Sequence, residues 1–80
     1  MRFTQYFAHM RRRPDRHGIR DEWIERVIAN PEAESVQADG RVRLWARITE
    51  AEGRYLRVIL LEDREAVHNA FFDRGFRERK

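Results

Sequence analysis

Two segments near the start of the chain carry apolar residues at helical spacing. In the first segment the apolar positions are three or four residues apart: Phe3, Tyr6, Phe7 and Met10. In the second segment they are Trp23, Ile24, Val27 and Ile28. Thr4 can cap the first helix, and Pro14 predicts its end. Asp21 and Glu22 suit the positive N-terminus of the second helix, which Pro31 ends. The pattern therefore predicts two short helices in the first third of the chain.

Beyond residue 33 the apolar positions alternate with a period of two, which is typical of half-buried strands. This alternation predicts four strands, near residues 34–38, 41–50, 54–62 and 66–72, joined in sequence order. Turn residues separate them, and Asp39-Gly40 is the clearest hairpin signal. The expected fold class is α+β, with two N-terminal helices packed on one face of a three- to four-stranded antiparallel sheet. The expected domain organisation is a single domain over residues 1–80.

The alternation also assigns side chains to the two faces of this sheet. The face expected beneath the helices is aliphatic: Val42, Leu44, Ala46, Ile48, Leu56, Val58 and Leu60. The other face carries arginines and rings: Arg41, Arg43, Trp45, Arg47, Tyr55 and Arg57. Such a surface can hold phosphates while rings stack on bases, but cross-strand arginine–aromatic packing gives the same pattern. In the last strand the sequence does not decide which set of alternating side chains faces the helices. Either the set with His68 or the set with Val67 is turned toward them.

Composition narrows the choice of function. The chain has no cysteine, which excludes a disulfide framework and a thiolate zinc site. Its longest apolar run, Val58 to Leu61, is too short to span a membrane, so a cytoplasmic protein is expected. Lys80 is the only lysine among 17 basic residues. Arginine suits phosphate and base stacking and so favours a nucleic-acid partner, although a GC-rich genome would give the same bias.

Charge is also unevenly distributed, although the net charge is only +3. Residues 1–20 contain six arginines and one acid, whereas residues 21–40 contain six acids and one arginine. The basic surplus therefore lies in the first segment and in the arginine-rich strands.

Candidate catalytic groups are few. His9, His17 and His68 have no zinc-motif spacing, so neither a metal site nor a cofactor is expected. A metal-independent RNA cleavage, in which a 2′-hydroxyl attacks the adjacent phosphate, needs a proton-transfer group and a phosphate clamp. His68 with Arg57 and Arg74 could supply both. The alternative interpretation of His68 is a half-buried strand histidine bonded to the backbone.

Four stretches together resemble a family of small bacterial domains of unknown function: "HGIRDEWIERVIANPE", "DGRVRLWARI", "GRYLRVILLED" and "VHNAFFDRGF". That family is in turn similar to RelE-like toxins, especially the BrnT type, which cleave RNA and are neutralised by an antitoxin. The resemblance covers roughly residues 3–77 and implies a RelE-like fold with RNA on the open sheet face. The implied phosphate-binding arginines are Arg43, Arg57, Arg74 and Arg77.

Two hypotheses follow. The first is an RNA-directed module such as an endoribonuclease toxin, acting on RNA or the ribosome and paired with an antitoxin protein. Its arginines would clamp phosphate beside Trp45 and Tyr55, and His68 or Asp73 would move protons. The second is a non-enzymatic domain whose open face binds a protein partner or forms a homodimer, which would cover an exposed Trp45, Tyr55, Ile59 and Leu61.

Overall fold

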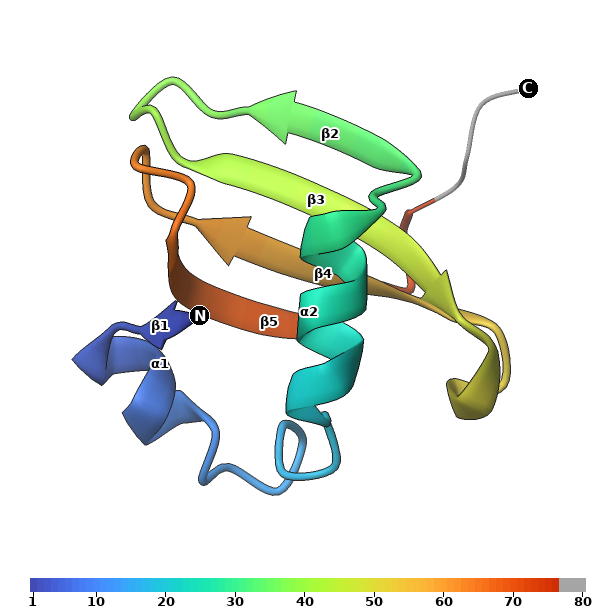
Figure 1. Ribbon diagram of the computed structural model, residues 1–80. Coiled ribbons are helices and arrows are strands. Elements are labelled where there is room, and N and C mark those ends of the chain that lie inside the picture. The colour runs from blue at the N-terminus through green and yellow to red at the C-terminus, as the bar shows by residue number, and fades with distance from the viewer. Residues whose placement is uncertain (77–80) are drawn as a thin grey trace.

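The structure is a computed structural model that describes residues 1–76 (Figure 1). Its two helices are α1 (Gln5–Met10) and α2 (Asp21–Ala29). Its strands are β1 (Arg2–Phe3), β2 (Ala33–Val36), β3 (Val42–Ile48), β4 (Arg54–Leu60) and β5 (Ala66–Phe72). The five strands form one sheet in the order β1-β5-β4-β3-β2. The α+β class and the meander of the last four strands are therefore confirmed. Arg77 lies outside the described residues.

The expectation of a three- to four-stranded, wholly antiparallel sheet is wrong, because a fifth strand lies at its edge. β1 pairs with β5 in parallel, with Arg2 opposite Ala66 and Phe3 opposite Val67. The amide of Thr4 extends this pairing by donating to the carbonyl of Val67 at 3.0 Å. β1 has two residues, too few to show alternation, and Phe3 also fits the helical spacing of α1.

A side-chain cap marks the start of α1 but not the start of α2. The hydroxyl of Thr4 accepts a hydrogen bond from the amide of Phe7 at 3.1 Å, which starts α1. α2 starts after Arg20 without a side-chain cap, and Asp21 and Glu22 occupy its first turn. None of the described helices is long and apolar enough to cross a membrane.

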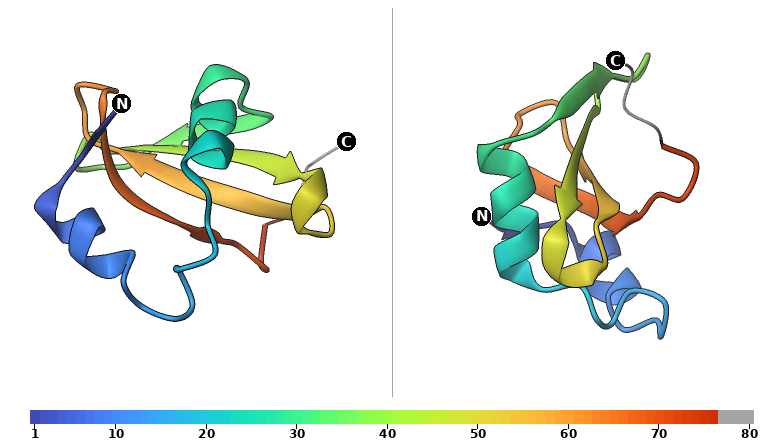
Figure 2. Two further views of the ribbon diagram at one scale, coloured as in Figure 1. Left: turned by 60° about the horizontal axis from the view of Figure 1, so that its bottom comes forward. Right: turned by 90° about the vertical axis from the view of Figure 1, so that its right-hand side faces the viewer.

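The core lies between α2 and the sheet. α2 crosses β3 and β4, whereas α1 packs against β5 beside the N-terminus, at the lower left of Figure 1 (Figures 1 and 2). Ile24 and Val27 of α2 are fully buried, as are Leu56 and Val58 of β4. Phe7 of α1 joins the same core with 1% exposure. The predicted aliphatic face is therefore the buried face, and the opposite face is left for other contacts.

A register shift in β5 decides the parity that the sequence leaves open. Phe72 and Ala70 lie opposite Leu56 and Val58, but the pairing shifts between Ile59 and Leu60 so that Leu60 faces Val67. His68 is the extra residue at this bulge, between Asn69 and Val67. Val67 and Ala70 are consequently both fully buried. Neither simple parity holds along the whole strand.

Candidate nucleic-acid interface

The face of the sheet opposite α2, called the open face below, is organised in cross-strand rows. Its members are Arg43, Trp45, Arg47, Tyr55, Arg57, Ile59, Asn69 and Phe71. Trp45, Arg57 and Phe71 lie directly opposite one another on β3, β4 and β5. On either side of this row, Arg43 faces Ile59 and Arg47 faces Tyr55. The sheet register therefore brings the sequence-predicted Arg43, Trp45, Tyr55 and Arg57 together on one surface.

Arg57 is packed between two rings. Its guanidinium carbon lies 5.2 Å from the centre of the Trp45 ring and 5.1 Å from that of Phe71. The guanidinium carbon of Arg43 lies 5.8 Å from the centre of the Trp45 ring, and Arg43 donates to the hydroxyl of Ser35 at 3.0 Å. These distances are those of cation–π contacts. The open face is thus a layer of alternating arginines and rings, as the packing alternative of the sequence predicts.

Asp73 links the central row to the end of β5. Its Oδ2 atom accepts from Arg57 Nη2 at 2.9 Å and from the indole Nε1 of Trp45 at 3.0 Å. Its Oδ1 atom accepts from the amide of Gly75 at 3.0 Å, which forms the turn after the strand. Burial by itself raises the pKa of Asp73, but the Trp45 hydrogen bond, the Arg57 charge and backbone amides outweigh it and lower the pKa. Asp73 is therefore held ionised and fully engaged.

Phe76 covers the Trp45 ring. The two rings stack with centres 4.8 Å apart and planes at 16°, and Phe76 also contacts Tyr55 edge-on at 4.9 Å. Trp45 is consequently only 7% exposed. The expectation of an exposed Trp45 that a partner would cover is wrong, because the chain covers this ring itself.

Arg16 also belongs to this surface, although no sequence motif singles it out. It lies in the loop between α1 and α2, and its Nη1 atom donates to Asn69 Oδ1 at 2.8 Å. Its guanidinium carbon lies 5.1 Å from the centre of the Phe71 ring. The basic loop thus joins the open face across β5. The arginine-rich composition of residues 11–20 was the only signal, and it could not show which arginine reaches the sheet.

His68 lies apart from Asp73. Its ring stacks on Tyr6 with centres 4.8 Å apart, and its Nδ1 atom lies 3.2 Å from the hydroxyl of Thr4. Burial lowers the pKa of His68, the charge of Arg41 lowers it further, and Asp39 partly opposes both. Asp73 follows five residues later, which at about 3.3 Å per strand residue separates the two Cα atoms by roughly 16 Å. The two candidate proton-transfer residues therefore do not form a pair.

Arg74 is the remaining candidate arginine among the described residues, and Arg47 is a further arginine of the open face. Arg74 is exposed in the turn after β5. Arg47 lies over the Tyr55 ring at 5.2 Å and donates to its hydroxyl at 3.1 Å. Among residues 1–76 no group of three or more His, Asp or Glu side chains is arranged to hold a metal ion.

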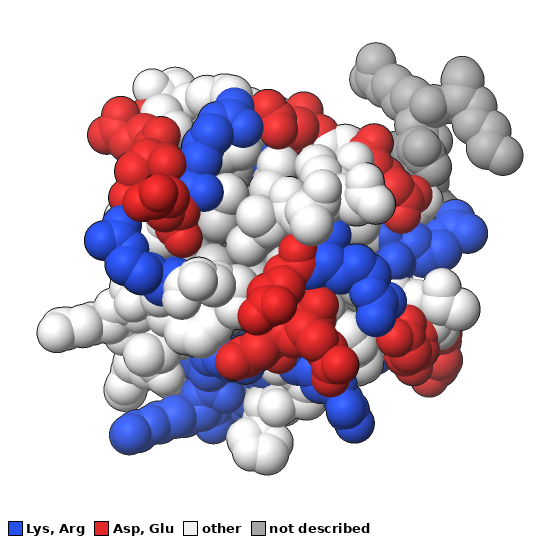
Figure 3. Space-filling model, in the orientation of Figure 1, with Lys and Arg blue, Asp and Glu red and all other residues white. Residues whose placement is uncertain are grey.

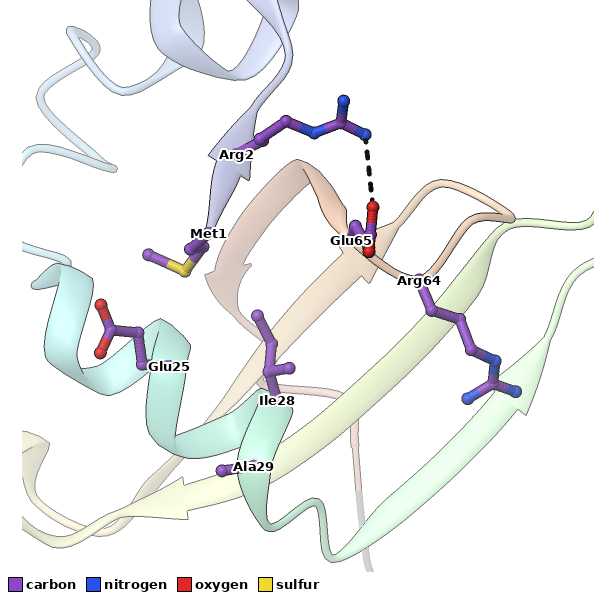
Figure 4. A pocket seen from close by; sticks show the side chains of 7 residues that line it. All are labelled: Met1, Arg2, Glu25, Ile28, Ala29, Arg64 and Glu65. Atoms are coloured by element: carbon purple, nitrogen blue, oxygen red, sulfur yellow. Dashed lines mark ion pairs between the residues drawn. The ribbon is translucent and has the colours of Figure 1, made fainter.

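The α2-covered face differs from the open face in its charge. Acidic and basic side chains are interspersed on it (Figure 3). A groove of about 530 Å³ lies here beside the N-terminus, with Met1, Ile28 and Ala29 among its lining residues (Figure 4). Its two arginines, Arg2 and Arg64, are offset by Glu25 and Glu65, and Arg2 lies 3.9 Å from Glu65. This groove therefore offers no surplus of positive charge to a nucleic acid.

Comparisons with known proteins found no relative of the chain. No protein-family model matches the chain, and no curated protein or solved structure matches it.

Proposed function

We propose that the chain is an RNA-binding domain that holds single-stranded RNA on its open face. The observation that carries the proposal is the layer of arginines and rings on this face. Arg16, Arg43, Arg47 and Arg57 lie within it beside Trp45, Tyr55 and Phe71, whereas Asp73 is the acid that enters it. Arginines next to aromatic rings are the combination that neutralises phosphates and stacks on bases.

The arginines have different roles in this proposal. Arg57 is only 26% exposed and is paired with Asp73, so its main role is to hold the rings in place. Arg43 and Arg16 bind uncharged oxygens, those of Ser35 and Asn69. Neither interaction neutralises the guanidinium, although Asp15 lies 3.6 Å from Arg16. Arg16 has only 15% of its side chain exposed and forms an ion pair with Asp15, so it is assigned, like Arg57, to holding a ring in place. Arg43 is therefore the arginine that we assign to phosphate, and the partly exposed Phe71 is the ring assigned to a base.

The sequence resemblance allows a more specific proposal about the class of domain. Two helices followed by an antiparallel meander are the arrangement that the RelE and BrnT resemblance implies, and we propose a RelE-like domain on that basis. A cytoplasmic location and an antitoxin partner belong to the same proposal. RNA cleavage is not part of the proposal. His68 contacts Thr4 and Tyr6, and Asp73 is bound to Arg57 and Trp45. The protein-interface alternative is weakened because Phe76 already covers Trp45.

The proposal is tested by fluorescence anisotropy with a labelled single-stranded RNA over a series of salt concentrations. Phosphate contacts make the logarithm of affinity fall with the logarithm of salt, with a slope of about −0.7 per contact on single strands. Arg43→Gln should weaken binding and make this slope shallower by roughly one contact. Arg26→Gln removes the same charge from α2 and is the matched control. Equal effects of the two variants would refute the open face as the binding surface.

A further inference from the structure

A second cleft lies where β4 begins and β5 ends, at the border of the open face. It has a volume of about 290 Å³ and is lined by Arg54, Tyr55, Phe72, Asp73, Arg74 and Phe76. We propose that this cleft binds the terminal phosphate monoester of an RNA strand. The inference rests on the proposed function, because the rest of that strand would lie on the open face.

Two contacts hold the guanidinium of Arg54 in an orientation that suits anion binding. Its Nε atom donates to the carbonyl of Ala51 at 3.0 Å, and its guanidinium carbon lies 4.1 Å from the centre of the Phe72 ring. These two contacts fix the plane of the guanidinium without using its two terminal nitrogens. A guanidinium held in this way loses little side-chain entropy when it binds phosphate through two parallel hydrogen bonds.

The cleft keeps its positive charge. No carboxylate among residues 1–76 forms an ion pair with Arg54 or with Arg74. Asp73 is the acid among the described lining residues, and its oxygens are occupied by Arg57, Trp45 and the amide of Gly75. Two guanidinium groups therefore line the cleft, and no described acid forms an ion pair with either of them.

The size and position of the cleft favour the end of a strand. A volume of about 290 Å³ is at the lower end of small-molecule sites, which are roughly 300–1,000 Å³, so the cleft can take one small group. A phosphate monoester carries a charge of about −1.5 to −2 at neutral pH, which suits two arginines better than an internal phosphodiester does. Tyr55 lines the cleft and also lies in the open-face rows, so the two sites are continuous.

The test compares three RNAs of one sequence, carrying a 5′-phosphate, a 3′-phosphate or hydroxyls at both ends. Binding is measured by anisotropy with the wild-type chain. We expect one of the two phosphorylated RNAs to bind about tenfold more tightly than the hydroxyl RNA, the size of a charged hydrogen bond. The end that gives the preference identifies the source of the phosphate.

Three variants test which residues cause the tighter binding of the phosphorylated RNA. Arg54→Gln and the exposed Arg74→Gln should each bring the affinity of the phosphorylated RNA close to that of the hydroxyl RNA. Arg26→Gln on α2 should keep the preference. Since Arg74 is exposed in a turn, its substitution tests the inference even where Arg54→Gln fails to fold. Equal affinity of the wild-type chain for all three RNAs would overturn the inference and leave the proposed function standing. No binding of any RNA would overturn both.

Discussion

Arg57 Nη2 and Asp73 Oδ2 lie 2.9 Å apart on the open face, with 26% and 14% of their side chains exposed. The pair joins the middle of β4 to the turn after β5, and Trp45 donates to the same oxygen. The arginine, the acid and the indole therefore stabilise one another. This relationship explains why the "FFDRGF" stretch closes the strand: Asp73 forms the turn through Gly75 while it anchors the arginine and the indole.

Replacing Asp73 should destabilise the fold. Asp73→Asn keeps an acceptor for Trp45 but leaves the partly buried Arg57 without its counter-charge, at a cost of about 1–3 kcal/mol. Urea denaturation measures this loss. The neighbouring Arg74→Gln is the matched control, and as an exposed substitution it should change stability by no more than about 0.5 kcal/mol. An unchanged stability of Asp73→Asn would show that the pair does not hold the open face.

Stability should fall in acid. The pKa of Asp73 is lower in the folded chain than its ordinary value of 3.8. The hydrogen bonds from Arg26, and then from its own backbone, lower the pKa of Glu50 to about 2. Groups with lowered pKa values stabilise the fold fully above the pKa of the unfolded chain and lose this effect as pH falls through the folded pKa.

Unfolding free energies at several pH values check this dependence. The wild-type chain should lose stability between roughly pH 5 and pH 2. Asp73→Asn should lose less unfolding free energy than the wild type over the same interval, because it already lacks the contribution of the ionised Asp73. Parallel curves for the two proteins would contradict the ionised state assigned to Asp73.

The helix cap formed by Thr4 should contribute measurably to the free energy of unfolding. Thr4→Ala removes the oxygen that caps α1 and the neighbour of His68 Nδ1, so we expect a loss of about 1 kcal/mol. Thr4→Ser keeps the hydroxyl and should restore most of this loss. A serine variant no more stable than the alanine variant would assign the effect to the lost methyl group instead of the cap.

His68 should titrate as a structural residue. Because burial and Arg41 lower its pKa, the folded chain should bind this proton below the ordinary value of 6.5. The stability that His68 contributes is then complete above that value and falls as pH drops toward the lowered folded pKa. A proton NMR titration of its ring measures the pKa directly.

His68 also separates binding from cleavage. His68→Ala should lose the stacking on Tyr6 and therefore some stability, while RNA affinity stays close to that of the wild type. The purified chain is incubated with total RNA and with translating ribosomes beside this variant, and the RNA ends are mapped. Discrete cuts by the wild type that vanish in a folded His68→Ala protein would make His68 catalytic and contradict the structural role.

The sequence predicts most of the fold for identifiable reasons. The alternation in β3 and β4 predicts which side chains are buried, since a two-residue period leaves no second choice for Leu44 or Val58. The caps and turn residues place the helices and hairpins to within a few residues. β1 is missed because two residues carry no period. The parity of β5 is missed because a bulge at His68 changes it within the strand.

The candidate site is predicted less completely. Strand alternation predicts that Arg43, Trp45, Tyr55 and Arg57 share a face, because register alone decides this. It cannot predict that Phe76 covers Trp45 or that Arg16 reaches Asn69, because both contacts join residues distant in sequence through loops. Residue type alone suggests His68 and Asp73 as alternative proton-transfer groups, and residue type cannot predict that each is already held by structural contacts.

The two tryptophans allow the most direct test of the central claim. Trp45 lies on the open face, whereas Trp23 on α2 packs against Phe72 on the helix side. Each indole N–H gives its own signal in a two-dimensional NMR spectrum, so a titration with single-stranded RNA reports on both faces at once. The account predicts that the Trp45 indole signal shifts with RNA by more than the Trp23 signal. A shift of Trp23 alone, or of neither signal at saturating RNA, would contradict it.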